Sequence, residues 1–193
     1  MFEAHQICVL LDAASAQIKA MILLAINCGF GNNDCGSLPK SAVDLDGGWV
    51  SFPRPKTGIK RRVPLWPETI NALRAALDDR LRASDEDGTE NLFFLTKYGK
   101  SWSQNTSTNP ISAEFRKLAQ SLGLYRKGNG FYAIRHTFLT IGDETKDFVA
   151  VASIMGHSDE SMADRYRERV SDDRLKAVTD HVRDWLFSDS DKK

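Results

Sequence analysis

The chain has 193 residues, of which 41% are hydrophobic, and its formal net charge is zero. This length and composition suit one globular domain with a sizeable core. The most apolar stretch, residues 21–26, is too short to cross a membrane and too internal to be a signal peptide, which indicates a soluble chain. Three cysteines without a paired spacing (Cys8, Cys28 and Cys35) argue against a disulfide framework and a zinc site, and favour a reducing cytoplasm.

The charges are segregated along the chain. Net neutrality counts mildly against a nucleic-acid partner, because domains that bind nucleic acid usually carry a basic excess. Five cations nevertheless fall within nine residues, with no acid between Asp46 and Glu68: Arg54, Lys56, Lys60, Arg61 and Arg62. The acids gather elsewhere, in residues 78–90 and 143–147. The basic and the acidic groups can each be an ordinary solvated face. Alternatively, they form a basic face of the protein opposite an acidic one, and the segregation of the charges favours this second interpretation.

The first half of the chain predicts helices around a small basic hairpin. Apolar residues at helical spacing predict a helix from Asp12 to Cys28 that Gly29 ends, and a short helix over 32–38 follows. Residues 49–53 and 59–65 are expected to form two short strands, joined by a tight reversal at Lys56-Thr57-Gly58. Prolines at positions 53 and 64 indicate a sheet with little interior.

The second half predicts further helices. One begins at Pro67, and another covers 110–122 after the acidic loop 84–90, a buried extended segment at 92–95 and a polar loop at 96–109. A helix of about three turns follows residues 128–130, and another runs from a cap at Asp147 to a glycine at 156. A short helix from about 159 and a final helix capped at 171–172 complete the chain, ahead of a frayed tail at 188–193. The final helix has an apolar face made of Leu175, Val178, Val182, Trp185 and Leu186.

Three residues in this second half carry chemistry suited to a phosphodiester. Arg135 offers a planar fork of donors that can clamp a phosphate. His157 can give a hydrogen bond or a proton to an oxygen, and the hydroxyl of Tyr166 can act as a nucleophile. An isolated helix tyrosine would be unremarkable, but Tyr166 follows the Gly156-His157 pair by nine residues, with Arg135 upstream.

These intervals resemble the second half of the active site of the tyrosine recombinases, also called phage-type integrases. The family pattern is His-x-x-Arg, then Gly-His about twenty residues on, then Tyr nine residues after that histidine. In this chain Tyr132 holds the place of the first histidine. A tyrosine can hydrogen-bond a phosphate oxygen, but with an ordinary pKa near ~10 it is a poor general base. His136, next to Arg135, faces another way on the helix and is interpreted as structural.

The hairpin also resembles the family. Residues 55–58, Pro-Lys-Thr-Gly, followed by Arg-Arg-Val-Pro-Leu at 61–65, match the β-hairpin that bears the family lysine, which makes Lys56 its counterpart and general acid. The alternative is a basic hairpin that makes generic phosphate contacts. Arg54, Lys60, Arg61 and Arg62 are expected to contact DNA.

The first half of the active site departs from the family. Where relatives have Gly-Leu-Arg-x-x-Glu, residues 29–34 of this chain are Gly-Phe-Gly-Asn-Asn-Asp. Asp34 can stand in for the glutamate, but Gly31 occupies the place of an arginine that holds the scissile phosphate. Either catalysis is lost, or a nearby cation replaces that arginine, with Arg54, Arg61 and Arg62 as the candidates.

The resemblance implies a mainly helical α+β fold with a small antiparallel sheet. We expect one integrase-like catalytic domain over 1–193, with its core at about 12–187 and without the N-terminal DNA-clamping domain of relatives. The implied partner is double-stranded DNA, with self-association on DNA through the C-terminal helix. The resemblance implies no cofactor, metal, membrane or small-molecule substrate, and a cytoplasmic protein of a prokaryote or mobile element.

The implied reaction is site-specific recombination through a 3′-phosphotyrosyl intermediate. Two alternatives remain at this point: a catalytically weakened relative that still binds DNA, and a helical interaction module with no DNA partner.

Overall fold

The computed structural model describes residues 1–80, 88–103, 109–157 and 169–188. The fold is mainly helical with one small antiparallel sheet, as the sequence predicts. Within these ranges, no helix combines the length and the apolar character that a membrane span requires.

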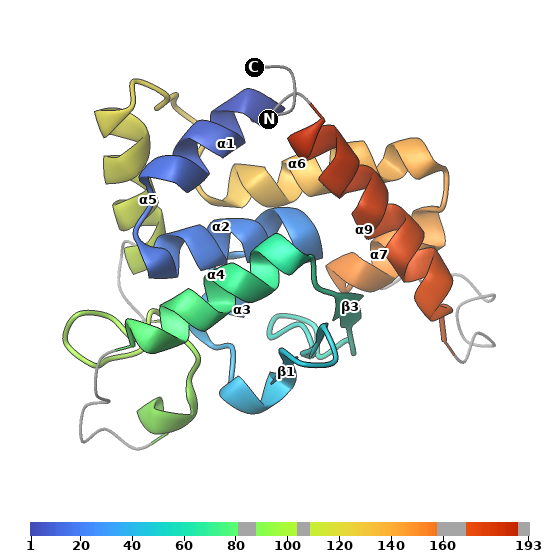
Figure 1. The fold of residues 1–193 in the computed structure, drawn as a ribbon, viewed down its shortest axis with the longest axis horizontal. Helices are drawn as coiled ribbons and strands as arrows, with labels where there is room; N and C mark the ends of the chain where they lie inside the picture. The colour runs from blue at the N-terminus through green and yellow to red at the C-terminus, as the bar shows by residue number, and fades with distance from the viewer. Residues whose placement is uncertain (81–87, 104–108, 158–168, 189–193) are drawn as a thin grey trace.

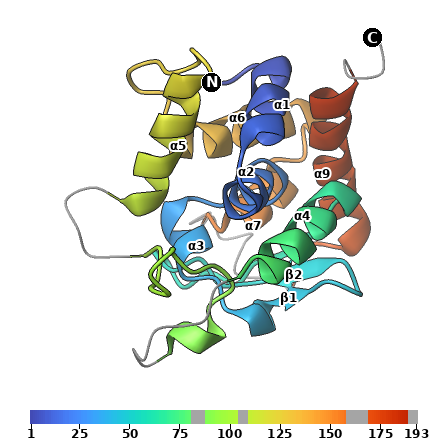
Figure 2. The ribbon, with the colours of Figure 1, turned by 60° about the vertical axis from the view of Figure 1, so that its left-hand side comes forward.

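The centre of the fold is α2 (Ala16–Cys28). Figure 2 looks nearly along this helix and shows the other helices arranged around it, with α1 (Ala4–Ala13) and α6 (Tyr132–Gly142) on one side and α4 (Pro67–Asp78) on another. Every residue from Ala20 to Cys28 is buried. A helix that is apolar on all sides is stable only when it is enclosed in this way.

The prediction of one helix from Asp12 to Cys28 is wrong at its start. The chain forms two helices there, because Ala14 and Ser15 adopt extended backbone (ψ 146° and 158°) and break the helical hydrogen bonding. Residues 4–13 form a helix that the sequence analysis missed, and its apolar side contributes to the core. The predicted end is confirmed, since Gly29 closes α2 in the left-handed conformation, at φ 61°.

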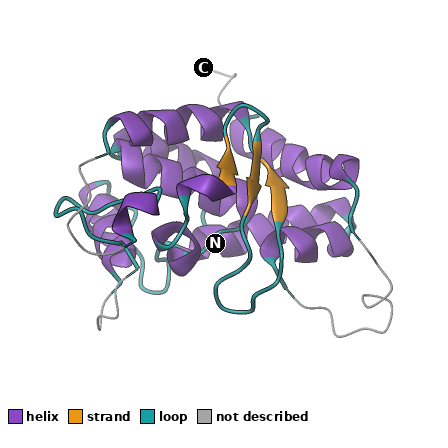
Figure 3. Cartoon of the chain, turned by 90° about the horizontal axis from the view of Figure 1, so that it is seen from below, coloured by secondary structure: helices purple, strands orange, loops and turns teal. Residues whose placement is uncertain are grey.

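The sheet lies on the lower side of the helices in Figure 1, and Figure 3, seen from that side, shows its strands in front of them. It contains β1 (Val43–Asp44), β2 (Trp49–Ser51) and β3 (Arg62–Pro64), in that order and all antiparallel. β1 was not predicted, and the two predicted strands are shorter than expected. Beyond their ends the hairpin continues as backbone pairing, with the Arg54 amide donating to the Ile59 carbonyl at 2.8 Å.

The remaining α-helices follow the predicted order, and the short 3₁₀ helices between them were not predicted. Their bounds are α3 (Asn32–Gly36), η1 (Lys40–Ala42), η2 (Thr89–Asn91), α5 (Pro110–Ser121), η3 (Asp143–Thr145), α7 (Phe148–Met155) and α9 (Asp172–Phe187). The side chain of Asp147 caps α7 by accepting from the Ala150 amide at 3.0 Å. In the segment 92–95, Phe93, Phe94 and Leu95 are buried, and Leu92 and Leu95 form isolated bridges instead of a strand. The short helix predicted from about 159 lies outside the described residues.

The final helix, α9, packs on its own chain. It crosses beside α1, α6 and α7 (Figure 1), and its residues Leu175, Val178, Val182 and Leu186 are buried there. Trp185 is only half-buried. Docking of the predicted apolar face is therefore confirmed, and in this arrangement that face is not available to a second copy of the chain.

Candidate active site

Arg135 links three parts of the chain. It sits on α6, is only 1% exposed, and donates through Nη1 to the Gly29 carbonyl and through Nη2 to the Met155 carbonyl at 2.8 Å. The guanidinium therefore ties the C-terminal ends of α2 and α7 together. Burial lowers the pKa of Arg135, with the charge of Arg54 adding to the effect, yet an arginine keeps its proton in proteins.

His157 lies directly against this guanidinium. Its Nε2 is 3.0 Å from Nη2 of Arg135. A guanidinium can only donate, so Nε2 accepts and the ring is neutral, with its proton on Nδ1. Burial lowers the pKa of His157, and the charges of Arg135 and Arg54 lower it further. The imidazole thus offers one hydrogen bond, from Nδ1, at neutral pH.

We expect His157 to titrate below the ordinary histidine pKa of about 6.5. Its folded pKa is lower than its unfolded pKa, so between those values the unfolded chain binds more protons and the free energy of unfolding falls as the pH falls. Imidazole NMR signals, assigned with a His157→Gln variant, measure the midpoint directly. A midpoint at or above 6.5 would contradict the neutral ring and its contact with Arg135.

The basic hairpin packs on the loop that carries His157. Arg54 Nη1 and Thr57 Oγ1 both donate to the carbonyl of Gly156, each at 3.3 Å. Gly156 has φ 62°, and a Cβ there would lie 2.7 Å from Cδ of Arg61. This position therefore requires glycine both for its backbone and for the close approach of the hairpin.

A cleft of about 390 Å³ opens beside this contact. The residues that line it come from α3, the hairpin and the starts of α5 and α6: Gly31, Asn32, Asn33, Asp34, Arg54, Pro55, Lys56, Asn109, Ser112 and Tyr132. Lys56, Tyr132 and Gly31, three positions singled out by the family pattern, thus face the same cleft. His136 is exposed, and its ring and that of Tyr132 meet in a T-shaped arrangement with the centroids 5.1 Å apart.

The space beside Gly31 is occupied by Tyr132. Gly31 is extended (φ −101°), a conformation open to any residue, but a Cβ there would lie 3.0 Å from the Tyr132 ring. The Gly31 amide donates to Oδ2 of Asp34 at 2.6 Å. An arginine side chain at position 31 would therefore meet the phenol of Tyr132 rather than a strained backbone.

Arg61 is not a surface cation. Its side chain is fully buried, lies over the Phe30 ring at 4.4 Å, and donates through Nη2 to Oδ1 of Asp34 at 2.6 Å. Its Nη1 is buried without a hydrogen-bond partner among the described residues. Because Arg61 lies on the inward face of the hairpin, little of it is exposed for the expected contact with DNA.

Three of the other hairpin cations, Lys56, Lys60 and Arg62, are exposed. Arg62 pairs with Asp172 at the start of α9, with 2.5 Å between Nη1 and Oδ1, and its guanidinium lies 3.4 Å from the Trp49 ring centroid. Tyr166 lies in 158–168, outside the described residues. Within the described ranges, no three histidine, cysteine or acidic side chains gather as a metal site would need.

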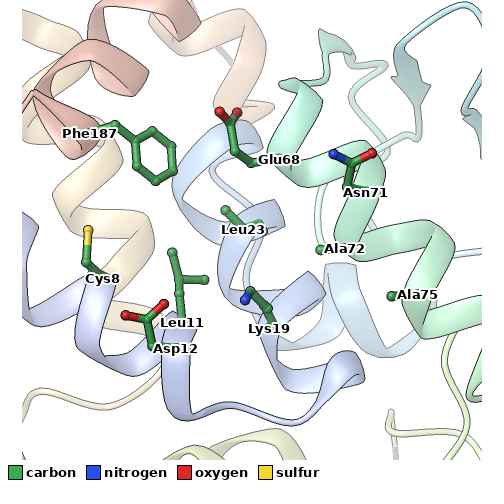
Figure 4. Close-up of a pocket in the computed structure, with 10 residues that line it drawn as sticks. All are labelled: Cys8, Leu11, Asp12, Lys19, Leu23, Glu68, Asn71, Ala72, Ala75 and Phe187. Carbon is green, nitrogen blue, oxygen red and sulfur yellow. The ribbon is translucent and has the colours of Figure 1, made fainter. Parts of the chain in front are cut away.

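A second cleft, of about 500 Å³, lies between α1, α2, α4 and the end of α9 (Figure 4). Its described lining is largely apolar, with Leu11, Leu23 and Phe187 among the side chains drawn there. Among the residues described there, the lining has one cation, Lys19, and two acids, Asp12 and Glu68. This chemistry does not suit a phosphate, so the smaller basic cleft is the better candidate site.

Two of these features were not among the predictions from the sequence. The contact of Arg54 and Thr57 with Gly156 joins residues about a hundred positions apart, and no local pattern predicts it. Burial of Arg61 was predictable, because alternation along a strand places it on the same face as Val63, which is buried.

The arrangement of helices and hairpin is the fold of tyrosine recombinase catalytic domains. The XerA recombinase matches with a TM-score of 0.67 at 20% identity, over 98% of this chain and 62% of that chain. The integrase from mycobacterium phage Brujita matches with a TM-score of 0.67 at 18% identity, over 93% of this chain and 56% of that one. The XerH recombinase bound to a palindromic difH substrate matches with a TM-score of 0.66 at 18% identity, over 90% of this chain and 49% of that chain.

The sequence model of the phage integrase family matches residues 1–172, and the chain belongs to that family. A comparison with curated proteins found no match. The chain spans about half to two thirds of the length of the solved chains described above.

Proposed function

We propose that this chain catalyses site-specific DNA strand transfer. The observation that supports this most is the contact between Arg135 and His157 beside a cleft lined by Arg54 and Lys56, in a member of the phage integrase family. The similar XerH structure is a post-cleavage complex with its difH substrate, which makes double-stranded DNA the partner to test.

In the proposed reaction the Tyr166 hydroxyl gives up its proton to solvent as its oxygen attacks the scissile phosphorus. A 3′-phosphotyrosyl bond forms, the bond from phosphorus to the 5′ oxygen breaks, and Lys56 gives a proton to the leaving oxygen. The 5′ hydroxyl of another strand then attacks the phosphotyrosine and gives its proton to Lys56, and the released Tyr166 oxygen takes a proton from solvent. Each step exchanges one phosphoester for another, so no energy-supplying nucleotide is consumed. Guanidinium groups stabilise the negative charge that develops on the non-bridging oxygens.

The test is capture of the covalent intermediate. Duplexes that bind the chain are selected from a randomised pool and then nicked near the bound site, so that the short cleaved fragment diffuses away and religation fails. An SDS-resistant protein–DNA adduct is expected with the wild-type chain and not with Tyr166→Phe. Salt-dependent binding without any adduct from the wild-type chain would instead support a non-catalytic DNA-binding relative.

Binding to duplex DNA should depend on the exposed hairpin lysines. Each phosphate contact releases condensed counterions, so Lys56→Gln with Lys60→Gln is expected to reduce the slope of log K against log salt by about 2. The measurement is a salt titration of binding by fluorescence anisotropy. Lys19→Gln in the second cleft is the control and should leave the slope unchanged. An equal slope in the double variant would show that these two lysines do not contact the DNA backbone.

A further inference from the structure

Arg54 has fewer protein partners than the other arginines near the candidate site. Among the described residues its side chain makes one hydrogen bond, to the Gly156 carbonyl at a long 3.3 Å, and no carboxylate lies within ion-pair distance. By contrast, Arg61 is buried against Asp34, and both Nη atoms of Arg135 are bound to protein acceptors. Most donors of the half-buried Arg54 guanidinium remain available to a ligand.

The surroundings of Arg54 suit an anion. It lines the basic cleft together with Lys56, and the acid in that lining, Asp34, is engaged with Arg61 and with the Gly31 amide. The two cations therefore face the cleft without a counterion among the described residues. The charge of Arg54 also lowers the pKa of both Arg135 and His157, which places all three groups within electrostatic reach of one another.

We infer that Arg54 is a catalytic residue that contacts a non-bridging oxygen of the scissile phosphate and supplies the guanidinium missing at position 31. This inference rests on the proposed strand transfer. It assigns the contact to the hairpin, two residues before Lys56, rather than to α3. Tyr132 occupies the space beside Gly31, so a guanidinium can enter this cleft from the hairpin side without displacing that ring.

The experiment compares Arg54→Ala with the wild type on two forms of the same nicked duplex. On the ordinary phosphodiester, loss of one donor to the developing charge is expected to slow adduct formation about 10²–10³-fold. On a duplex with a methylphosphonate at the scissile position, a methyl group replaces one charged oxygen and the linkage is neutral. The deficit of Arg54→Ala relative to the wild type should then shrink to a few-fold.

Thr57→Val is the matched control, because Thr57 donates to the same Gly156 carbonyl but carries no charge. It should leave the rate within a few-fold of the wild type on both duplexes. If Thr57→Val reproduces the Arg54→Ala deficit, or if that deficit is equal on both duplexes, Arg54 only supports the His157 loop and the inference is wrong. An unchanged rate in Arg54→Ala would also overturn it.

Failure of the proposed function has a different signature. A wild-type chain that forms no Tyr166-dependent adduct on the phosphodiester rejects strand transfer itself, and Arg54 then has no catalytic role. An active wild type whose rate does not depend on the charge of residue 54 rejects the inference alone.

Discussion

Asp34→Ala is expected to lower the free energy of unfolding by about 3–5 kcal/mol, since it leaves the buried charge of Arg61 without its counterion. The carboxylate lies 2.6 Å from the guanidinium, and the Arg61 side chain has no exposed surface. The same carboxylate accepts the Gly31 amide, so its loss leaves a second buried donor unsatisfied. Equilibrium unfolding in urea measures the change.

Asp46→Ala is the control for this prediction. Asp46 pairs with Arg74 at 2.9 Å, but the two side chains are 94% and 54% exposed. Solvent-exposed ion pairs contribute little to stability because water screens them. Asp46→Ala is therefore expected to lower the free energy of unfolding by less than about 1 kcal/mol. If Asp34→Ala costs no more than Asp46→Ala, water reaches Arg61 in the folded protein and the pair is not truly buried.

The pair between Asp34 and Arg61 also explains how the cleft keeps its shape. Asp34 belongs to α3 and Arg61 to the hairpin, so their contact fixes one wall of the cleft against another. The acid that matches the family glutamate by position therefore has a structural role in this chain. The cost of burying the Arg61 charge is offset in part by the Phe30 ring below it and the Phe52 carbonyl beside it.

Local sequence signals correctly predicted the helix ends that are marked by a glycine, a proline or a capping aspartate. Gly29, Gly156, Pro67 and Asp147 mark helix ends where the sequence analysis placed them. The break between α1 and α2 was missed because neither Ala14 nor Ser15 is a strong helix breaker, and tertiary packing decides between one helix and two.

The candidate site was predicted less completely, because motif spacing does not describe contacts between distant residues. Motif intervals selected Arg135 and His157, and the structure places them 3.0 Å apart. Charge density alone treated Arg54, Arg61 and Arg62 as equal candidates to replace the missing arginine. The fold separates them, since it buries Arg61 and pairs Arg62 with α9 while leaving Arg54 at the cleft.

The Tyr132 ring fills the space beside Gly31, so restoring an arginine at position 31 should also require a smaller residue at position 132. In an Arg54→Ala background, Gly31→Arg together with Tyr132→His is expected to recover most of the roughly 10²–10³-fold loss in adduct formation. The double change returns a guanidinium to the cleft and replaces the phenol with a smaller ring. Gly31→Arg alone should recover far less, because its Cβ would already lie 3.0 and 3.3 Å from two Tyr132 ring carbons.

An arginine at position 31 is expected to be obstructed by the Tyr132 side chain and not by strain in its own backbone. Gly31 is extended at φ −101°, so arginine can adopt its conformation without strain, whereas a glycine at positive φ would have forbidden the test. Tyr132 is 43% exposed, but its ring also packs on His136, which limits how far it can move aside.

Gly31→Gln with Tyr132→His is the control, since it supplies a long polar side chain without a charge. Full recovery by Gly31→Arg alone would show that the ring moves freely. No recovery in a folded, DNA-binding triple variant would show that position 31 does not face the phosphate, and the cation of this site would then have to come from the hairpin alone.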